Sequence, residues 1–151
     1  MILVDADVFV IDLRYHRDPL RRINRRFLDR LAMDGSGATT VFNLLEVAGI
    51  LSFNLNEEQL LNLLFLFPGK YGIAILPPLD LESILHQIPQ GALARRCAFG
   101  DALVIEAAER YAPKASCFVT WDAEHFAGRT AMQVITPRSA LEAWERGRIP
   151  V

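Results

Sequence analysis

Four acidic residues stand where a carboxylate is not an ordinary surface charge: Asp5, Glu46, Asp101 and Asp122. Asp5 and Asp122 follow short apolar runs typical of buried strands, whereas Glu46 and Asp101 lie in the first turns of apolar segments typical of helices. Glu46 is the only charged residue between positions 38 and 53, and a solvated acid rarely has such neighbours. Together the four positions indicate a cluster of buried or half-buried carboxylates.

Clustered carboxylates raise one another's pKa values unless a cation neutralises them. Oxygen ligands without thiolates or paired imidazoles favour Mg²⁺ or Mn²⁺. The three histidines are scattered at positions 16, 86 and 125, so a structural zinc site is not expected. A divalent ion of this kind can activate a water molecule and stabilise charge on a phosphoryl oxygen, which is the chemistry of phosphodiester hydrolysis.

Each acid also has a purely structural interpretation. Glu46 comes three residues after Asn43 and could complete a capping box, and Asp101 could be a simple N-cap. Asp5 and Asp122 could be turn residues. In an open parallel sheet, the carboxyl ends of the strands and the starts of the following helices meet along one edge, and all four acids are predicted to lie there. The structural interpretations explain the positions one at a time, but they do not explain this convergence.

The hydrophobic pattern alternates between strand and helix along the whole chain. It predicts strands over 2–4, 38–42, 71–76, 117–121 and 134–135, helices over 19–33, 44–53, 56–67, 101–111 and 138–146, a helix from 80 toward 88 and a helical turn at 125–126. Asn43 is predicted to cap the second helix, Asn56 and Gln59 form a capping box for the third, and Gly69 is predicted to end that helix. The alternation favours a three-layer α/β/α sandwich around a mainly parallel sheet of about five strands.

Size and composition limit the kind of protein. The chain has 151 residues, 52% of them hydrophobic, which predicts a single domain spanning 1–151. No apolar run is long enough to span a membrane, and the opening apolar run meets Asp5 too soon for a signal peptide. Two cysteines do not make a disulfide framework. We therefore expect a soluble, cytoplasmic protein without a membrane partner.

Several motifs in order resemble those of PIN-domain ribonucleases, and among these the VapC-like toxins. The matching segments are Val4-Asp5-Ala6-Asp7-Val8, Glu46 in its helix, Asp101-Ala102-Leu103-Val104-Ile105, Val119-Thr120-Trp121-Asp122-Ala123-Glu124-His125-Phe126 and Val134-Ile135-Thr136-Pro137. They span nearly the whole chain. Two departures stand in the first segment, because Ala6 lacks the usual hydroxyl and Asp7 replaces the usual Asn or Ser, which adds a fifth acid near Asp5.

The resemblance implies an endoribonuclease that depends on Mg²⁺ or Mn²⁺, cleaves single-stranded or structured RNA and is neutralised by an antitoxin as part of a toxin-antitoxin pair. It implies that Asp5, Asp101 and Asp122 hold the metal, directly or through water. Glu46 would orient or deprotonate the attacking water. Two alternatives within this fold stay open: an RNA-processing nuclease without an antitoxin, and a non-catalytic binding module.

A haloacid dehalogenase-like phosphatase is the rival enzyme class, since Asp5-Ala6-Asp7 resembles its Asp-x-Asp motif. Phe9 stands where that motif has Thr or Val, Ile105 stands where its later acid is needed, and the chain has no room for the usual cap. These mismatches favour the nuclease interpretation.

Two segments predict partner surfaces. Seven arginines lie in the segment 14–30 although the net charge is −2, and Arg22, Arg26 and Arg30 recur every four residues with Arg21 and Arg25 alongside. This face is either a solvated helix surface or a track for RNA phosphates.

The segment 60–67 is apolar around most of its helix. We expect it to be fully buried; otherwise it is a surface for a homodimer or an antitoxin helix.

Overall fold

The computed structural model describes residues 1–77, 80 and 82–148. Its strands are β1 (Ile2–Val4), β2 (Gly37–Thr40), β3 (Ile73–Leu76), β4 (Cys117–Val119) and β5 (Gln133–Ile135). Its α-helices are α1 (Ala6–Leu13), α2 (Arg21–Asp34), α3 (Val41–Leu51), α4 (Glu57–Tyr71), α5 (Ile88–Leu93), α6 (Phe99–Tyr111), α7 (Ala123–Phe126) and α8 (Pro137–Glu145). A π-helical turn, Ser83–Gln87, leads directly into α5.

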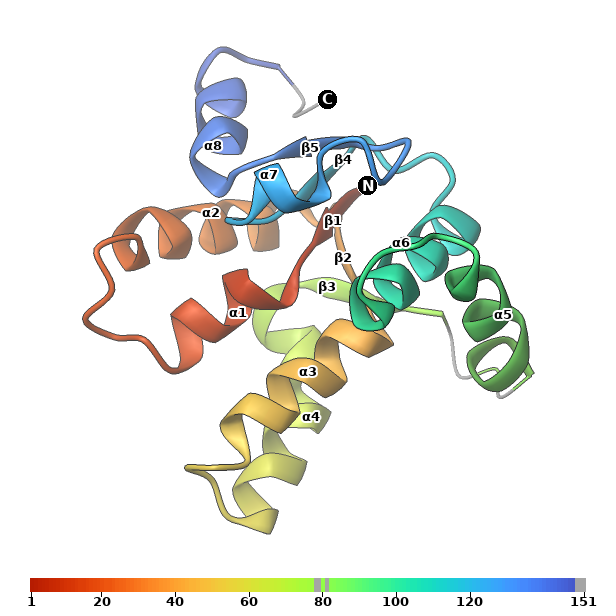
Figure 1. Ribbon diagram of the computed structural model, residues 1–151. Helices are drawn as coiled ribbons and strands as arrows, with labels where there is room; N and C mark the ends of the chain where they lie inside the picture. Colours follow the sequence, from red (N-terminus) through yellow and green to blue (C-terminus); the bar gives the residue numbers. More distant parts are fainter. Residues whose placement is uncertain (78–79, 81, 149–151) are drawn as a thin grey trace.

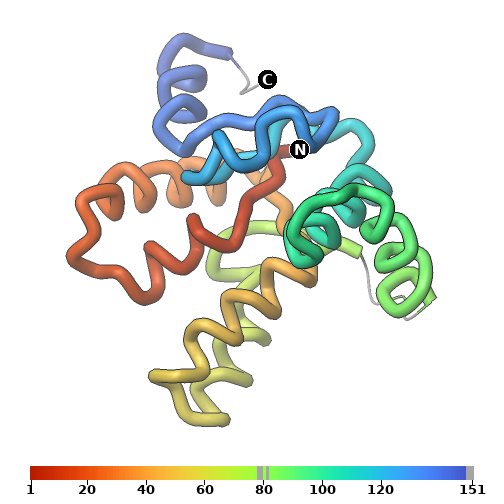
Figure 2. The backbone as a smooth tube through the Cα atoms, in the orientation of Figure 1, coloured from red at the N-terminus to blue at the C-terminus, as the bar shows by residue number. Residues whose placement is uncertain are grey.

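The five strands form one sheet in the order β3-β2-β1-β4-β5, and every pairing is parallel. The chain starts in the middle of the sheet, moves outward through β2 to β3, and then returns to add β4 and β5 on the other side of β1 (Figure 2). The strand order therefore reverses between β1 and β4. In open parallel sheets, the crevice beyond the carboxyl ends of the strands at such a reversal is the usual binding site.

Two apolar cores cover the two faces of the sheet. Alternate residues of β1 separate them, because Ile2 and Val4 pack into one core and Leu3 into the other. Helices α1, α2, α3, α4 and α8 contribute to the first core, and α6 and α7 to the second (Figure 1). This arrangement confirms the predicted three-layer α/β/α fold. Within the described residues, no helix is both long and apolar enough to cross a membrane.

Three predictions near the first two strands were wrong. No helix was predicted for residues 6–13, which form α1; six of its eight residues are buried, so its apolar pattern shows no solvent-facing side that would mark a helix. Strand β2 ends at Thr40, where the second strand was predicted to reach residue 42. Helix α3 starts at Val41 and is capped by Thr40, whose Oγ1 accepts the Asn43 N–H at 3.1 Å, so Asn43 is not the N-cap.

The predicted capping box at the start of α4 is confirmed. Asn56 Oδ1 accepts the Gln59 N–H at 2.9 Å, and Gln59 Oε1 accepts the Asn56 N–H at 3.0 Å. The helix does not stop at Gly69 but continues to Tyr71, whose hydroxyl donates to the buried Asp12 at 2.9 Å. It ends at Gly72, which has a φ of 60° and so adopts the left-handed conformation that glycine tolerates best.

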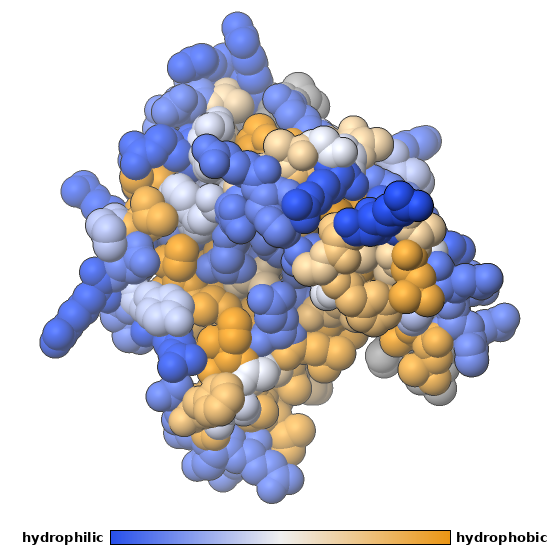
Figure 3. Space-filling view, viewed as in Figure 1, coloured by the Kyte–Doolittle hydropathy of each residue, from blue (hydrophilic) through white to orange (hydrophobic). Residues whose placement is uncertain are grey.

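The prediction that the segment 60–67 is fully buried was also wrong. Phe67 is buried, but Leu61 is 60% exposed, Phe65 84% and Leu66 60%. Helices α3 and α4 extend together from the body of the molecule, and among the described residues no helix covers one side of α4 (Figure 1). Figure 3 shows orange, hydrophobic surface over this pair of helices.

Candidate active site

The acidic residues lie at the strand reversal between β1 and β4. Asp5 directly follows β1, and its main-chain N–H donates to Val119 O, the last residue of β4, at 3.0 Å. Asp7 stands in the first turn of α1, and Asp122 comes at the start of α7. The geometry of the sheet thus brings residues more than 110 positions apart in the chain to one place.

Two polar side chains from the β2–α3 segment hold the end of β1 in place. The Val4 carbonyl accepts hydrogen bonds from Thr39 Oγ1 at 2.6 Å and from Asn43 Nδ2 at 3.1 Å. Asn43 is fully buried, and its amide also donates to Thr39 Oγ1 at 3.1 Å. These side chains satisfy a buried carbonyl that would otherwise be costly to leave without a partner, and they fix the residue before Asp5. Sequence reasoning missed this role.

Asp5 and Asp7 share the hydroxyl of Thr120. Thr120 Oγ1 lies 2.9 Å from Asp5 Oδ2 and 3.0 Å from Asp7 Oδ2. Asp7 Oδ2 also accepts the main-chain N–H groups of Trp121, at 2.8 Å, and Asp122, at 3.3 Å. Because a hydroxyl has only one proton to donate, it cannot satisfy both carboxylates when both are ionised. The arrangement therefore favours a proton or a cation between the two acids.

Burial and mutual repulsion raise the pKa values of three of these acids. The pKa of Asp5 rises to about 7, first through burial and then through the charge of Asp7. Burial also raises the pKa of Asp7, against the hydrogen bonds from Trp121 and Thr120. The pKa of Glu46 is raised by burial and then by the charges of Asp101 and Asp7. The fold thus brings Asp5, Asp7, Glu46 and Asp101 within electrostatic reach of one another.

Asp122 takes a different position from the other acids. Its main-chain N–H points to Asp7 Oδ2 and, at 3.0 Å, to Thr120 Oγ1, but the residue itself is exposed. It occupies the N-cap position of α7 without a side-chain capping bond. Asp122 is therefore adjacent to the cluster through its backbone, with its carboxylate free to face solvent.

Helix capping, the structural role that the sequence also allowed, explains only one of the other three acids. Asp5 does cap a helix, since its Oδ1 accepts the Ala6 N–H at 2.9 Å. Glu46 takes no part in a capping box, because the N-cap is Thr40 and not Asn43. Asp101 is not the N-cap of α6, a position held by Ala98 without a side-chain bond. Capping therefore does not account for Glu46 or Asp101.

The oxygen donors match the chemistry of a hard divalent cation, but they do not yet form a closed set of ligands. Among the described residues, no group of three Asp, Glu, His or Cys side chains is arranged ready to hold a metal ion. Asp7 Oδ1, however, is buried and has no hydrogen-bond partner within the same part of the chain. An unpaired carboxylate oxygen beside acids with raised pKa values is what a bound cation would stabilise.

His125 contacts one of the acids. The spacing of the histidines did not indicate this contact, because the three lie far apart along the chain. Its Nε2 lies 2.7 Å from Asp101 Oδ2, and Arg129 Nη1 lies 3.1 Å from the same Nε2. The only sequence signal was its place three residues after Asp122, within the short helix α7. The contact itself joins α7 to α6 and depends on the tertiary structure.

Comparison with known proteins confirms the fold. No family model matches the chain, and no curated protein matches its sequence. A solved structure of FitAB bound to an IR36 DNA fragment is 21% identical, with a TM-score of 0.57 over 91% of this chain and 96% of that chain. FitAcB from Neisseria gonorrhoeae is 19% identical, with a TM-score of 0.56 over 91% of this chain and 98% of that chain. These structures share the fold of this chain, which confirms the α/β architecture predicted from the sequence.

Proposed function

We propose that this protein is a metal-dependent endoribonuclease of the PIN type and that it acts as the toxin of a toxin-antitoxin pair. The observation that carries the proposal is the acid cluster at the strand reversal, where the charges of Asp7 and Glu46 raise the pKa of Asp5 and the charges of Asp101 and Asp7 raise the pKa of Glu46. Such a cluster is costly to assemble without a cation. The fold that the chain shares with the FitAB and FitAcB structures supports the proposal independently of the acid cluster.

In this proposal Asp5, Asp101 and Asp122 hold Mg²⁺ or Mn²⁺, directly or through water, and Asp7 adds an anionic oxygen beside Asp5. The ion, when bound, supplies Lewis acidity for phosphodiester hydrolysis. Glu46 orients or deprotonates the attacking water, and the second role suits a carboxylate whose raised pKa makes it a stronger base. The buried hydrogen bonds from Thr39 and Asn43 to Val4 O keep Asp5 in place during the reaction.

RNA cleavage tests the enzymatic part directly. The purified chain, incubated with an end-labelled single-stranded RNA of defined sequence and with a stem-loop RNA, should give discrete internal cuts in the presence of Mn²⁺ or Mg²⁺. Removal of the metal with EDTA should stop the reaction, and a DNA of the same sequence serves as the substrate control. Intact RNA at every metal concentration would contradict the assignment.

The antitoxin is a separate part of the proposal. FitAB was solved on a DNA fragment, and we infer for this chain a small DNA-binding partner encoded directly upstream. Expression of the chain alone should arrest growth, and co-expression with the product of a short upstream reading frame should restore it. A chain that is harmless when expressed alone would count against the toxin role but not against RNA cleavage.

The uncovered side of α4 supports a homodimer as a further element of the proposal. Phe65 and Leu66, together with Phe53 at the end of the α3–α4 pair, are among the most exposed large apolar side chains of the described residues. Exposed apolar patches of this kind mark interfaces more often than open surface. We propose that a second copy of the chain covers them.

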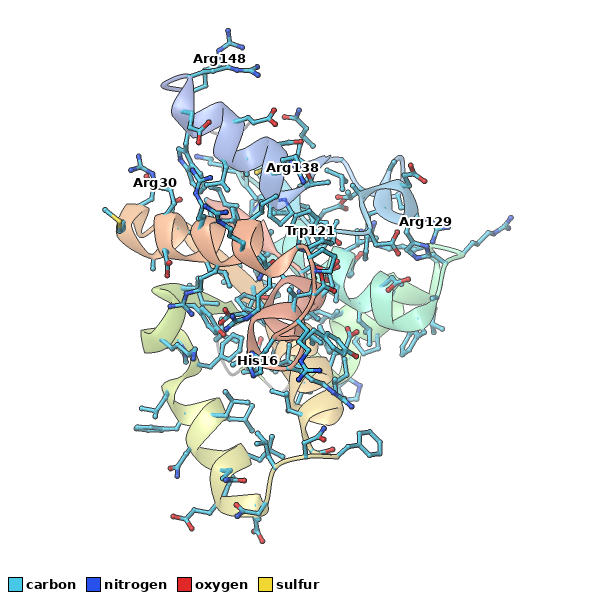
Figure 4. All side chains as sticks on the ribbon, turned by 90° about the vertical axis from the view of Figure 1, so that its left-hand side faces the viewer. His16, Arg30, Trp121, Arg129, Arg138 and Arg148 are labelled. Carbon is cyan, nitrogen blue, oxygen red and sulfur yellow. The ribbon has the colours of Figure 1, made fainter. Side chains whose placement is uncertain are left out.

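The arginine-rich helix α2 is proposed as part of the RNA-binding surface. Some of its charge is already neutralised, because Arg25 pairs with Asp12 and Asp29, and Arg26 with Glu145. Arg22 is exposed and has no ion pair among the described residues, and Arg30 lies over the Trp144 ring. Figure 4 shows Arg30 on α2 beneath α8. These arginines remain available to contact RNA phosphates.

A further inference from the structure

Helix α7 places an imidazole against one of the proposed metal-binding carboxylates. The helix is anchored by Phe126, whose ring packs edge-on against Phe118 of β4 with a centroid distance of 4.9 Å. This packing leaves the neighbouring His125 half-buried, with its Nε2 2.7 Å from Asp101 Oδ2 at the start of α6. The contact therefore joins two elements that both lie at the acid cluster.

The chemistry of the two groups, and not the distance between them, decides which atom donates. An ionised carboxylate can only accept hydrogen bonds, so the proton in this contact is on His125 Nε2. Arg129 Nη1 lies 3.1 Å from the same nitrogen, and it can donate only to an Nε2 that carries no proton, so a hydrogen bond from Arg129 and the hydrogen bond to Asp101 exclude each other. Figure 4 shows Arg129 beside α7 and α6. Only Oδ2 of Asp101 takes part in a hydrogen bond among the described residues, which leaves Oδ1 free to bind a ligand.

We propose that His125 is a positioning residue that orients the Asp101 carboxylate for metal binding. The inference rests on the proposed function, since it assumes that Asp101 binds the metal. A carboxylate that binds a cation through one oxygen while a second residue holds its other oxygen is restricted in rotation, and it binds the ion with less loss of conformational freedom. Residues in this role commonly change metal affinity by about 10–100-fold when they are removed.

The test compares His125→Ala and His125→Gln with the native chain. The amide nitrogen of Gln can reach the position of imidazole Nε2 and donate to Asp101 in its place, whereas Ala cannot. Glu124→Gln, at the exposed neighbouring position in α7, is the control for a change in the same helix that does not touch Asp101. The affinity for Mn²⁺ is measured by titration calorimetry in the absence of RNA, and thermal melting with EDTA checks that each variant is folded.

We expect His125→Ala to weaken Mn²⁺ binding by roughly 10–100-fold. His125→Gln should recover most of that loss, and Glu124→Gln should bind as the native chain does. Native affinity in His125→Ala, tighter binding in His125→Ala, or a His125→Gln variant as weak as His125→Ala would each overturn the positioning role while leaving the metal site intact. A native chain that binds no Mn²⁺ would overturn the proposed metal site and this inference with it.

Discussion

The carboxylate of Asp7 accepts a hydrogen bond from the main-chain N–H of Trp121, with 2.8 Å between Asp7 Oδ2 and the nitrogen. This bond joins the first turn of α1 to the loop that follows β4, across the strand reversal of the sheet. It gives Asp7 a structural role in addition to any part in binding metal. The other oxygen, Oδ1, is buried and unpaired among the described residues, so the two roles can be separated by substitution.

The substitution Asp7→Asn should separate the structural role of Asp7 from its part in metal binding. The amide oxygen can still accept the Trp121 N–H, while the repulsion with Asp5 disappears, so the free energy of unfolding without metal at pH 8 should rise by on the order of 1 kcal/mol. The stabilisation by Mn²⁺ should shrink at the same time. Denaturant unfolding with EDTA and with Mn²⁺ measures both. Asp7→Ala, which leaves the Trp121 N–H unpaired, should instead lose about 1–3 kcal/mol. An Asn variant stabilised by Mn²⁺ as strongly as the native chain would show that Asp7 is structural only.

Metal-free stability should depend on pH through Asp5. Its pKa is 3.8 in an ordinary setting and about 7 in the folded chain, so between these values the folded state binds more protons than the unfolded state. Stability contributed by Asp5 is therefore fully present below about pH 4 and falls as the pH rises to about 7, by roughly 2–4 kcal/mol.

The matched comparison for this effect is Asp5→Asn. Glu106 and Glu109 have lowered pKa values beside Arg95, so their contribution is lost as the pH falls and acts in the opposite direction. The difference between native and Asp5→Asn stability, measured in EDTA from pH 4.5 to 8, removes that background. We expect the native chain to lose stability relative to the variant as pH rises, and a saturating concentration of Mn²⁺ to reverse the trend. A difference independent of pH would show that Asp5 stays ionised.

Asp101→Asn should abolish metal-stimulated RNA cleavage and leave the fold intact. The substitution removes one negative oxygen from the proposed metal site but keeps the size of the side chain, and we expect a loss in rate of roughly 10²–10³-fold. Cleavage of a labelled RNA in Mn²⁺ measures the rate, and thermal melting checks the fold. Undiminished cleavage by this variant would refute the assignment.

Phe65→Glu should give a monomer. Phe65 is 84% exposed, so the charge costs the isolated chain little, within about 0.5 kcal/mol. In a dimer across α4, the same charge would be buried in an apolar interface. Light scattering coupled to size exclusion should find a dimer for the native chain and a monomer for the variant. Glu58→Gln, at an exposed position on the same helix, is the control. A native chain that is monomeric at all concentrations would remove the homodimer.

Arg22→Gln should weaken RNA binding equally for different RNA sequences. Loss of one phosphate contact should reduce the slope of log affinity against log salt by about 0.7 for a single strand. The measurement uses the Asp101→Asn background, so that the RNA stays intact, at several salt concentrations. Arg110→Gln makes the same change in charge near the far end of α6, where Arg110 pairs with Glu106, and should leave the slope unchanged. RNA affinity insensitive to salt would exclude the arginine track.

Much of the fold followed from the amino-acid sequence by itself. The strands predicted at 2–4, 117–121 and 134–135, of which the second ends at 119 and the third begins at 133 in the structure, depend on short apolar runs. The capping box at Asn56 and the three-layer architecture depend likewise on local patterns, a helix cap and the alternation of strand with helix. The sequence also indicated that Asp5 and Asp122 follow strands whose carboxyl ends face one edge of a parallel sheet. These features are encoded by neighbouring residues, and so they can be recognised without the partners they meet.

The rest was decided only when distant segments packed together. Asn43 has the chemistry of a helix cap, but the free carbonyl of Val4, 39 residues away, takes its amide and leaves the cap to Thr40. The apolar residues of α4 fit a buried helix equally well, and they are exposed because no other element of the described chain reaches that side. His125 gains its role from Asp101 on another helix. Burial and hydrogen-bond partners are properties of pairs of segments, and no pattern within one segment specifies them.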